Sequence, residues 1–175
     1  MERVPGSASA FGADPGLAEG EDMQTLLTTI VTWLSLNAGL PAFYEHPRIE
    51  FVPAAKMYAV RISGQVWGHS PGTAAGHSAG SGGENHVEAL YDDRSRTIYL
   101  PEGWSGATPA EVSVLVHEMV HHLQNLAGLK YECAEARERL AYDAQNLWLA
   151  RSGRNLLDEF RLDPVTVLLR TKCMH

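Results

Sequence analysis

Apolar residues recur along the chain with two different periods, which separate helical from extended segments. From Thr25 onward they recur three and four positions apart, which predicts a helix ending near Gly39 and Pro41. Two short segments rich in β-branched and aromatic residues follow at 48–52 (RIEFV) and 56–62 (KMYAVRI) and predict strands. The apolar positions of the helix are Leu26, Leu27, Ile30, Val31 and Leu34.

The remainder of the chain predicts a loop, a hairpin and a helical end. Residues 63–86 are rich in glycine and contain histidines, which predicts a flexible loop. Segments 87–93 and 96–100 predict a hairpin, and helices are expected at about 109–127, at about 132–151 and from about 155 onward. Because strands come early and helices late, we expect an α+β domain with a small antiparallel or mixed sheet.

The helix at 109–127 has strong signals at both ends. Thr108 can cap its first turn, Pro109 suits the first helical position, and Glu111 completes a capping box. Gly128 supplies the stop. The segment is therefore long enough for its two faces to be compared.

One face of this helix carries histidines in place of aliphatic residues. His117 and His121 are four positions apart, so both imidazoles point the same way and can bind one ion. Glu118 lies about 100° further round, where a carboxylate can reach a water molecule without binding the metal itself. This is the HExxH pattern of zinc peptidases, with Glu118 as the general base.

A third ligand is needed, because two histidines alone hold catalytic zinc poorly. The three-histidine extension HExxHxxGxxH is absent from the sequence. On the next helix, Glu138 shares its face with small and semi-polar residues, and a carboxylate that points inward there requires a partner such as a cation. Glu135, one turn away, is the alternative ligand.

Composition bounds the domain and its partners. The chain is 45% hydrophobic and 20% charged, which fits one globular domain at 23–175 after a disordered segment at 1–22 that is rich in Gly, Ala, Ser and Pro. The net charge of −7 gives no reason to expect a nucleic-acid or membrane partner. Cys133 and Cys173 are expected to be reduced thiols in the cytoplasm, with a single bridge as the alternative.

Together, HEMVHHLQ and the helix that carries Glu138, Tyr142 and Gln145 resemble the gluzincin-type zinc metallopeptidases, in particular small bacterial zincin-like domains. The resemblance covers roughly residues 23–151 and implies a leading helix, a short curled sheet and the HExxH helix followed by the Glu helix. It implies that His117, His121 and Glu138 bind Zn²⁺. Tyr142 stands where the common pattern has an aspartate, so the usual carboxylate that orients a ligand histidine is missing there.

By the same resemblance, the chain is expected to hydrolyse a peptide or protein substrate. Glu118 would be the base, and Tyr142, Tyr131 and His122 are candidate donors to the developing oxyanion. The strand at 96–100 is expected to form the sheet edge that pairs with substrate. One alternative is a catalytically inactive zincin-like module that binds metal and another protein; a second is a helical domain with an accidental HExxH.

Overall fold

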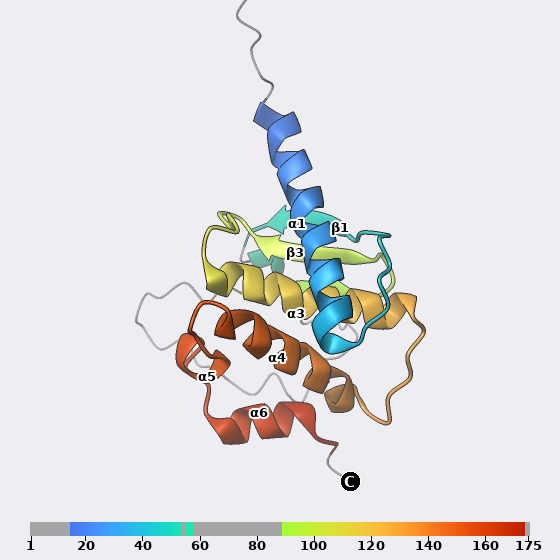
Figure 1. Cartoon of the computed structure of the whole chain (residues 1–175), viewed down its shortest axis with the longest axis vertical. Coiled ribbons are helices and arrows are strands. Elements are labelled where there is room, and N and C mark those ends of the chain that lie inside the picture. The colour runs from blue at the N-terminus through green and yellow to red at the C-terminus, as the bar shows by residue number, and fades with distance from the viewer. Residues whose placement is uncertain (1–14, 54, 58–88, 174–175) are drawn as a thin grey trace, which may run out of the picture.

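The computed structural model describes residues 15–53, 55–57 and 89–173. Within these residues the chain is an α+β fold, as expected, and the predicted loop at 63–86 lies outside them. The elements follow in the order α1 (Pro15–Ala38), β1 (Arg48–Val52), β2 (Leu90–Asp92), β3 (Thr97–Pro101), α3 (Pro109–Leu126), α4 (Ala134–Ala150), α5 (Leu156–Glu159) and α6 (Pro164–Thr171) (Figure 1).

The three described strands form one mixed sheet in the order β1-β3-β2. β3 pairs in parallel with β1 and antiparallel with β2, which confirms the predicted hairpin. The prediction that 96–100 forms the sheet edge is wrong, because β3 has a neighbour on both sides. Residues 55–57 are helical, so no strand begins at Lys56, and the rest of the predicted strand at 56–62 lies outside the described residues.

Helix α3 occupies the centre of the fold. Figure 1 shows it running between the sheet on one side and α4 on the other, with α1 crossing nearby. The middle of its apolar face, from Val114 to Leu123, is buried and packs into the main core with residues of α1 and β3. Side chains with 0% exposure in this core include Leu27, Ile30, Leu34, Ile98, Leu115, Met119 and Leu123.

Helix α1 carries the predicted apolar face but begins earlier than expected. It starts at Pro15, so residues 15–22 are helical rather than part of a disordered segment. Proline suits the first position of a helix, and the Leu, Ala and Glu residues that follow favour helical backbone. None of the described helices combines the length and apolar character needed to cross a membrane.

The C-terminal segment is two short helices joined to α4 by a disulfide. Asn155 caps α5 and Asp163 caps α6, with Pro164 at the first position of α6. Cys133, the residue before α4, is bonded to Cys173, and their Cα atoms are 5.8 Å apart. The expectation of two reduced thiols is therefore wrong, because the return of α6 along α4 brings the two cysteines together.

Candidate metal centre

Helix α3 begins and ends where the sequence predicts. The Thr108 side chain accepts a hydrogen bond from the Glu111 backbone N–H, and the Glu111 carboxylate accepts one from the Thr108 backbone. Burial alone would raise the pKa of Glu111, but hydrogen bonds from Ser105 and Thr108 outweigh it and lower this pKa. Gly128 has a φ of 61°, the left-handed conformation that commonly follows a helix end. Both ends of α3 are thus fixed.

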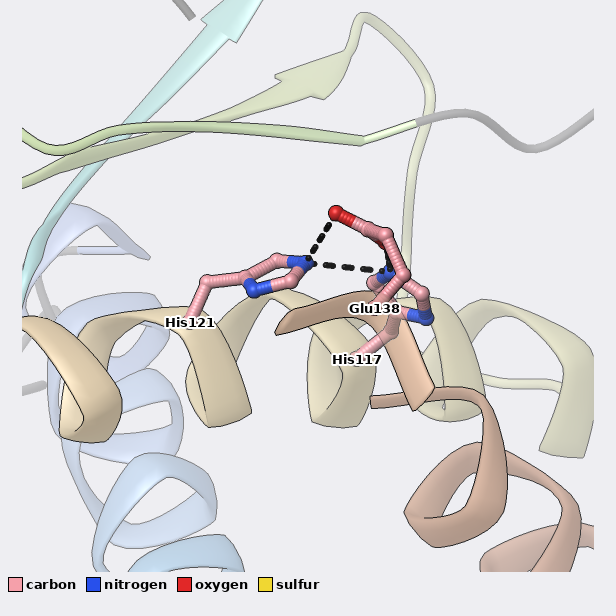
Figure 2. A group of neighbouring side chains, drawn as sticks. All are labelled: His117, His121 and Glu138. Atoms are coloured by element: carbon pink, nitrogen blue, oxygen red, sulfur yellow. Dashed lines mark hydrogen bonds and ion pairs between the residues drawn. The ribbon is translucent and has the colours of Figure 1, made fainter. Parts of the chain in front are cut away.

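Two histidines of α3 and one glutamate of α4 converge in the interior. His117, His121 and Glu138 are 8%, 6% and 6% exposed. The two Nε2 atoms are 3.3 Å apart, and the Glu138 carboxylate oxygens lie 3.1 Å from His117 Nε2 and 3.3 Å from His121 Nε2. Figure 2 shows the three side chains pointing toward one another. They form a buried group that could bind a metal ion, and Glu135 is not part of it.

Two glutamine side chains hold the outer nitrogens of the histidine rings. His117 Nδ1 lies 3.1 Å from Gln145 Oε1, and His121 Nδ1 lies 3.0 Å from Gln124 Oε1. An amide oxygen can only accept, so each Nδ1 carries the proton and donates it. In the neutral imidazole this leaves a lone pair on each Nε2, directed toward the centre of the group, as a metal ligand requires.

The orientation of the Gln124 amide is fixed by a further chain of hydrogen bonds. Its nitrogen donates to the Arg137 carbonyl at 3.1 Å, and its oxygen accepts from Arg137 Nε at 3.2 Å. The Arg137 guanidinium also donates to the His121 carbonyl and makes a two-bond ion pair with Asp93. A carboxylate does therefore support a ligand histidine, but Asp93 acts through Arg137 and Gln124 rather than directly.

The charges within the group stabilise one another. Burial would raise the pKa of Glu138, but the neighbouring His121 and His117 outweigh it and hold this pKa far below its usual range. For His121, burial would lower the pKa, and the Glu138 carboxylate outweighs it so that the pKa is raised. A positive charge at the centre of the group is therefore favoured, whether it comes from protons or from a metal ion.

The predicted base lies beside the three converging side chains. Glu118 follows His117 on α3 and is 8% exposed. Its charge acts on both His121 and Tyr142, which places it near the group without being a member of it. No hydrogen bond or ion pair within the described part of the chain engages its carboxylate. Glu118 is thus close to the centre, and none of the described residues engages its carboxylate.

The three predicted oxyanion donors have different surroundings. The Tyr142 ring meets the His117 ring edge-on, with centroids 4.8 Å apart, so it borders the group. Tyr131 hydrogen-bonds with Gln124. His122 is turned away: its Nε2 donates to the Glu45 carbonyl at 2.6 Å and its Nδ1 accepts from the Tyr91 hydroxyl at 3.0 Å. Of the three, only Tyr142 is in contact with a ligand histidine.

Sequence reasoning missed the residues that surround the ligands. Gln124 shares the histidine face of α3 and Gln145 shares the Glu138 face of α4, so their positions gave a usable signal. Arg137 lies directly before Glu138 on α4 but does not share the Glu138 face, so the helical pattern did not assign it to the site. Its long side chain instead crosses to α3, and the contact with Asp93 joins residues far apart in the sequence, for which no local pattern exists.

Comparison with known proteins identifies the family. The model of a family described as a domain of unknown function (DUF6647) matches residues 19–175. Because the match spans most of the chain, the chain belongs to this family. No curated protein and no solved structure matches the chain.

Proposed function

We propose that this member of the DUF6647 family is a zinc-dependent peptidase, in which His117, His121 and Glu138 hold the metal and Glu118 is the general base. The observation that carries the proposal is the convergence of three buried ligand atoms. In both histidines the Nδ1–H group already donates a hydrogen bond to a glutamine, so Nε2 is left as the ligand atom. The proposal also follows from the resemblance of the HExxH helix and the Glu helix to gluzincin-type peptidases.

The distances within the group fit zinc. Two ligand atoms about 2.1 Å from one ion, at tetrahedral angles, lie about 3.4 Å apart. The two Nε2 atoms are 3.3 Å apart, and the nearest carboxylate oxygens are 3.1 and 3.3 Å from them. Two imidazoles and one carboxylate are also a donor set that catalytic zinc uses, with a fourth position left open. The residues present therefore suit this metal.

The residues around the metal have distinct tasks. Bound zinc supplies a Lewis acid that polarises a carbonyl and makes a water molecule more acidic. In this proposal Glu118 would take a proton on its carboxylate and pass it to the leaving amine. Tyr142, through its hydroxyl, is the candidate donor to the developing negative charge. Gln124 and Gln145 keep the histidine rings in the tautomer that leaves Nε2 free.

Substitution of Glu118 separates the peptidase from the inactive metal-binding module. Glu118→Gln keeps the shape of the side chain and removes the base, so zinc content should stay at the wild-type level while cleavage of a peptide library falls by about 100-fold or more. If the zinc-loaded wild-type protein cleaves no peptide in the library, this result would contradict the proposed peptidase activity and favour the inactive metal-binding module.

The disulfide bears on where the protein acts. The cytoplasmic location expected from the sequence rested partly on reduced cysteines, and the Cys133–Cys173 bond removes that support. Disulfides persist mainly in oxidising compartments. We therefore propose an oxidising compartment as the site of action, and alkylation of free thiols in intact cells tests it: modified Cys133 and Cys173 would contradict this location.

A further inference from the structure

Arg170 places a guanidinium close to the candidate metal centre. It lies near the end of α6, and its Nη1 donates to the Tyr142 hydroxyl at 3.1 Å. The Tyr142 ring in turn meets the His117 ring, with centroids 4.8 Å apart and an interplanar angle of 77°. A single aromatic side chain thus separates Arg170 from a proposed zinc ligand.

Among the described residues, the charge of Arg170 has no acidic partner. Arg137 pairs with Asp93 and Arg154 pairs with Glu159, but within residues 15–53, 55–57 and 89–173 no carboxylate lies within ion-pair distance of Arg170. Its side chain is nevertheless only partly exposed. A guanidinium has five N–H donors in a planar fork, and Tyr142 occupies one of them, so most of the fork is available to another acceptor.

The position of Arg170 is fixed by a covalent link to the helix that carries Glu138. Cys173, three residues after Arg170, is bonded to Cys133 at the start of α4. Glu138 and Tyr142 follow on that same helix. The disulfide therefore keeps the backbone at Arg170 close to α4, and the hydrogen bond to Tyr142 orients the guanidinium, which favours selective binding of a planar anion.

We propose that the Arg170 guanidinium, which donates one hydrogen bond to the Tyr142 hydroxyl, forms a carboxylate-binding subsite beside the metal centre with its remaining N–H groups, so that the peptides this protein prefers carry a carboxylate near the bond to be cleaved. The inference rests on the proposed peptidase function. The carboxylate can be the C-terminus of the peptide or an acidic side chain, because a guanidinium fork binds both in the same way.

Binding to a protein that cannot cleave its ligand tests this subsite directly. The zinc-loaded Glu118→Gln protein would be titrated with three acetylated tetra-alanine peptides: one with a free C-terminus, one with an amidated C-terminus, and an amidated one in which the third alanine is glutamate. Binding would be followed through the NMR signals of the arginine Nε–H groups. We expect the Arg170 signal to shift with one or both of the acidic peptides and to shift far less with the neutral peptide.

Three substitutions, made in the same protein, complete the experiment. Arg170→Met, which keeps length and removes charge, should weaken binding of the responsive acidic peptide by about tenfold or more and leave the neutral peptide and the zinc content unchanged. Arg170→Lys should restore only part of the affinity, because it lacks the fork. Lys172→Met is the matched control, since it removes an exposed charge two residues away. It should change neither the affinity for the peptides nor the zinc content.

The outcomes distinguish this subsite from the peptidase function. Equal affinity for acidic and neutral peptides when Arg170 is present, or equal losses for both in Arg170→Met, would overturn the subsite. If the wild-type protein cleaves no peptide but Arg170 still selects the acidic ones, the peptidase function fails and the subsite stands. The peptide that responds identifies the source of the carboxylate.

Discussion

At the scale of single residues, the glutamine amides of Gln124 and Gln145 decide the protonation of the two ligand histidines. Each amide oxygen accepts a hydrogen bond from Nδ1–H, which keeps the proton on Nδ1 and leaves Nε2 as the ligand atom. The spacing of His117 and His121 predicted that their rings share a face, because side chains one turn apart do so, whereas Glu138 was proposed from the inward face of the next helix with Glu135 as the alternative. The contact between α4 and α3 through Arg137 was not predictable, since it depends on how the two helices meet.

The third ligand can be tested with a matched pair of substitutions on α4. Glu138→Ala removes a carboxylate whose oxygens lie 3.1 and 3.3 Å from the histidine nitrogens, whereas Glu135 lies outside the group. Competition with a chelator should show that Glu138→Ala weakens zinc binding by more than the roughly 10–100-fold typical of an outer-shell partner. Glu135→Ala should leave it near the wild-type value. A larger loss of zinc affinity in Glu135→Ala than in Glu138→Ala would show that Glu138 is not the third ligand.

The buried hydroxyl of Tyr91 makes stability depend on alkaline pH. Burial raises the pKa of Tyr91 to about 12, against about 10 in an unfolded chain. The folded state therefore keeps a proton that the unfolded state loses, and this contribution to the free energy of unfolding declines as pH rises from about 10 to about 12.

Tyr91→Phe isolates that contribution. The variant should lose about 1–3 kcal/mol at neutral pH, because His122 Nδ1 loses its donor and the Asn125 amide keeps only its bond to the Asp93 carbonyl. Urea unfolding at a series of pH values should then show a shallower decline above pH ~10 than wild type. Parallel curves for the two proteins would refute the role assigned to this hydroxyl.

At the scale of elements, the close packing of α3 against α4 depends on small side chains. Ala141 is 0% exposed and Ala144 is 2% exposed, and both lie in the main core. The sequence indicated Ala141 at this contact because it shares the Glu138 face. The pairing of β1 with β3 had no such signal, because two strands about fifty residues apart find their neighbours through the whole fold rather than through local pattern.

A larger residue at Ala141 should separate the two helices. Ala141→Leu is expected to cost about 1–3 kcal/mol of unfolding free energy and to weaken zinc binding, since Glu138 would move away from the histidines. Ala150→Leu, at an exposed position of the same helix, is the control and should change neither quantity appreciably. Zinc affinity that is equal in the two variants would show that the spacing of α3 and α4 does not control the site.

At the scale of the whole molecule, the disulfide closes a loop that contains α4, α5 and α6. Cys133 and Cys173 are separated by 40 residues, and a crosslink over such a loop removes freedom from the unfolded chain. Their spacing in the sequence gave no indication of a bond, because only the return of α6 along α4 makes them neighbours. The bond therefore stabilises the part of the fold that carries Glu138, Tyr142 and Arg170.

Removal of this bond should destabilise the protein and disturb the region around α6. The Cys133→Ser, Cys173→Ser double variant is expected to lose about 2–4 kcal/mol of unfolding free energy, measured by denaturant titration with zinc in excess. Reduction of the wild-type protein should give a similar loss, and reducing agent should have no effect on the double variant. An unchanged wild-type stability after reduction would show that the bond is absent in solution or does not contribute.

The measurement that tests the central claim most directly is the metal content of the wild-type protein purified with zinc present. Elemental analysis should find one zinc ion per chain, and the ion should be lost when His121 is replaced by Ala, because the imidazole supplies one of three protein ligands. A wild-type protein that contains no zinc under these conditions, or that binds it equally well without His121, would contradict the claim that His117, His121 and Glu138 form a metal centre.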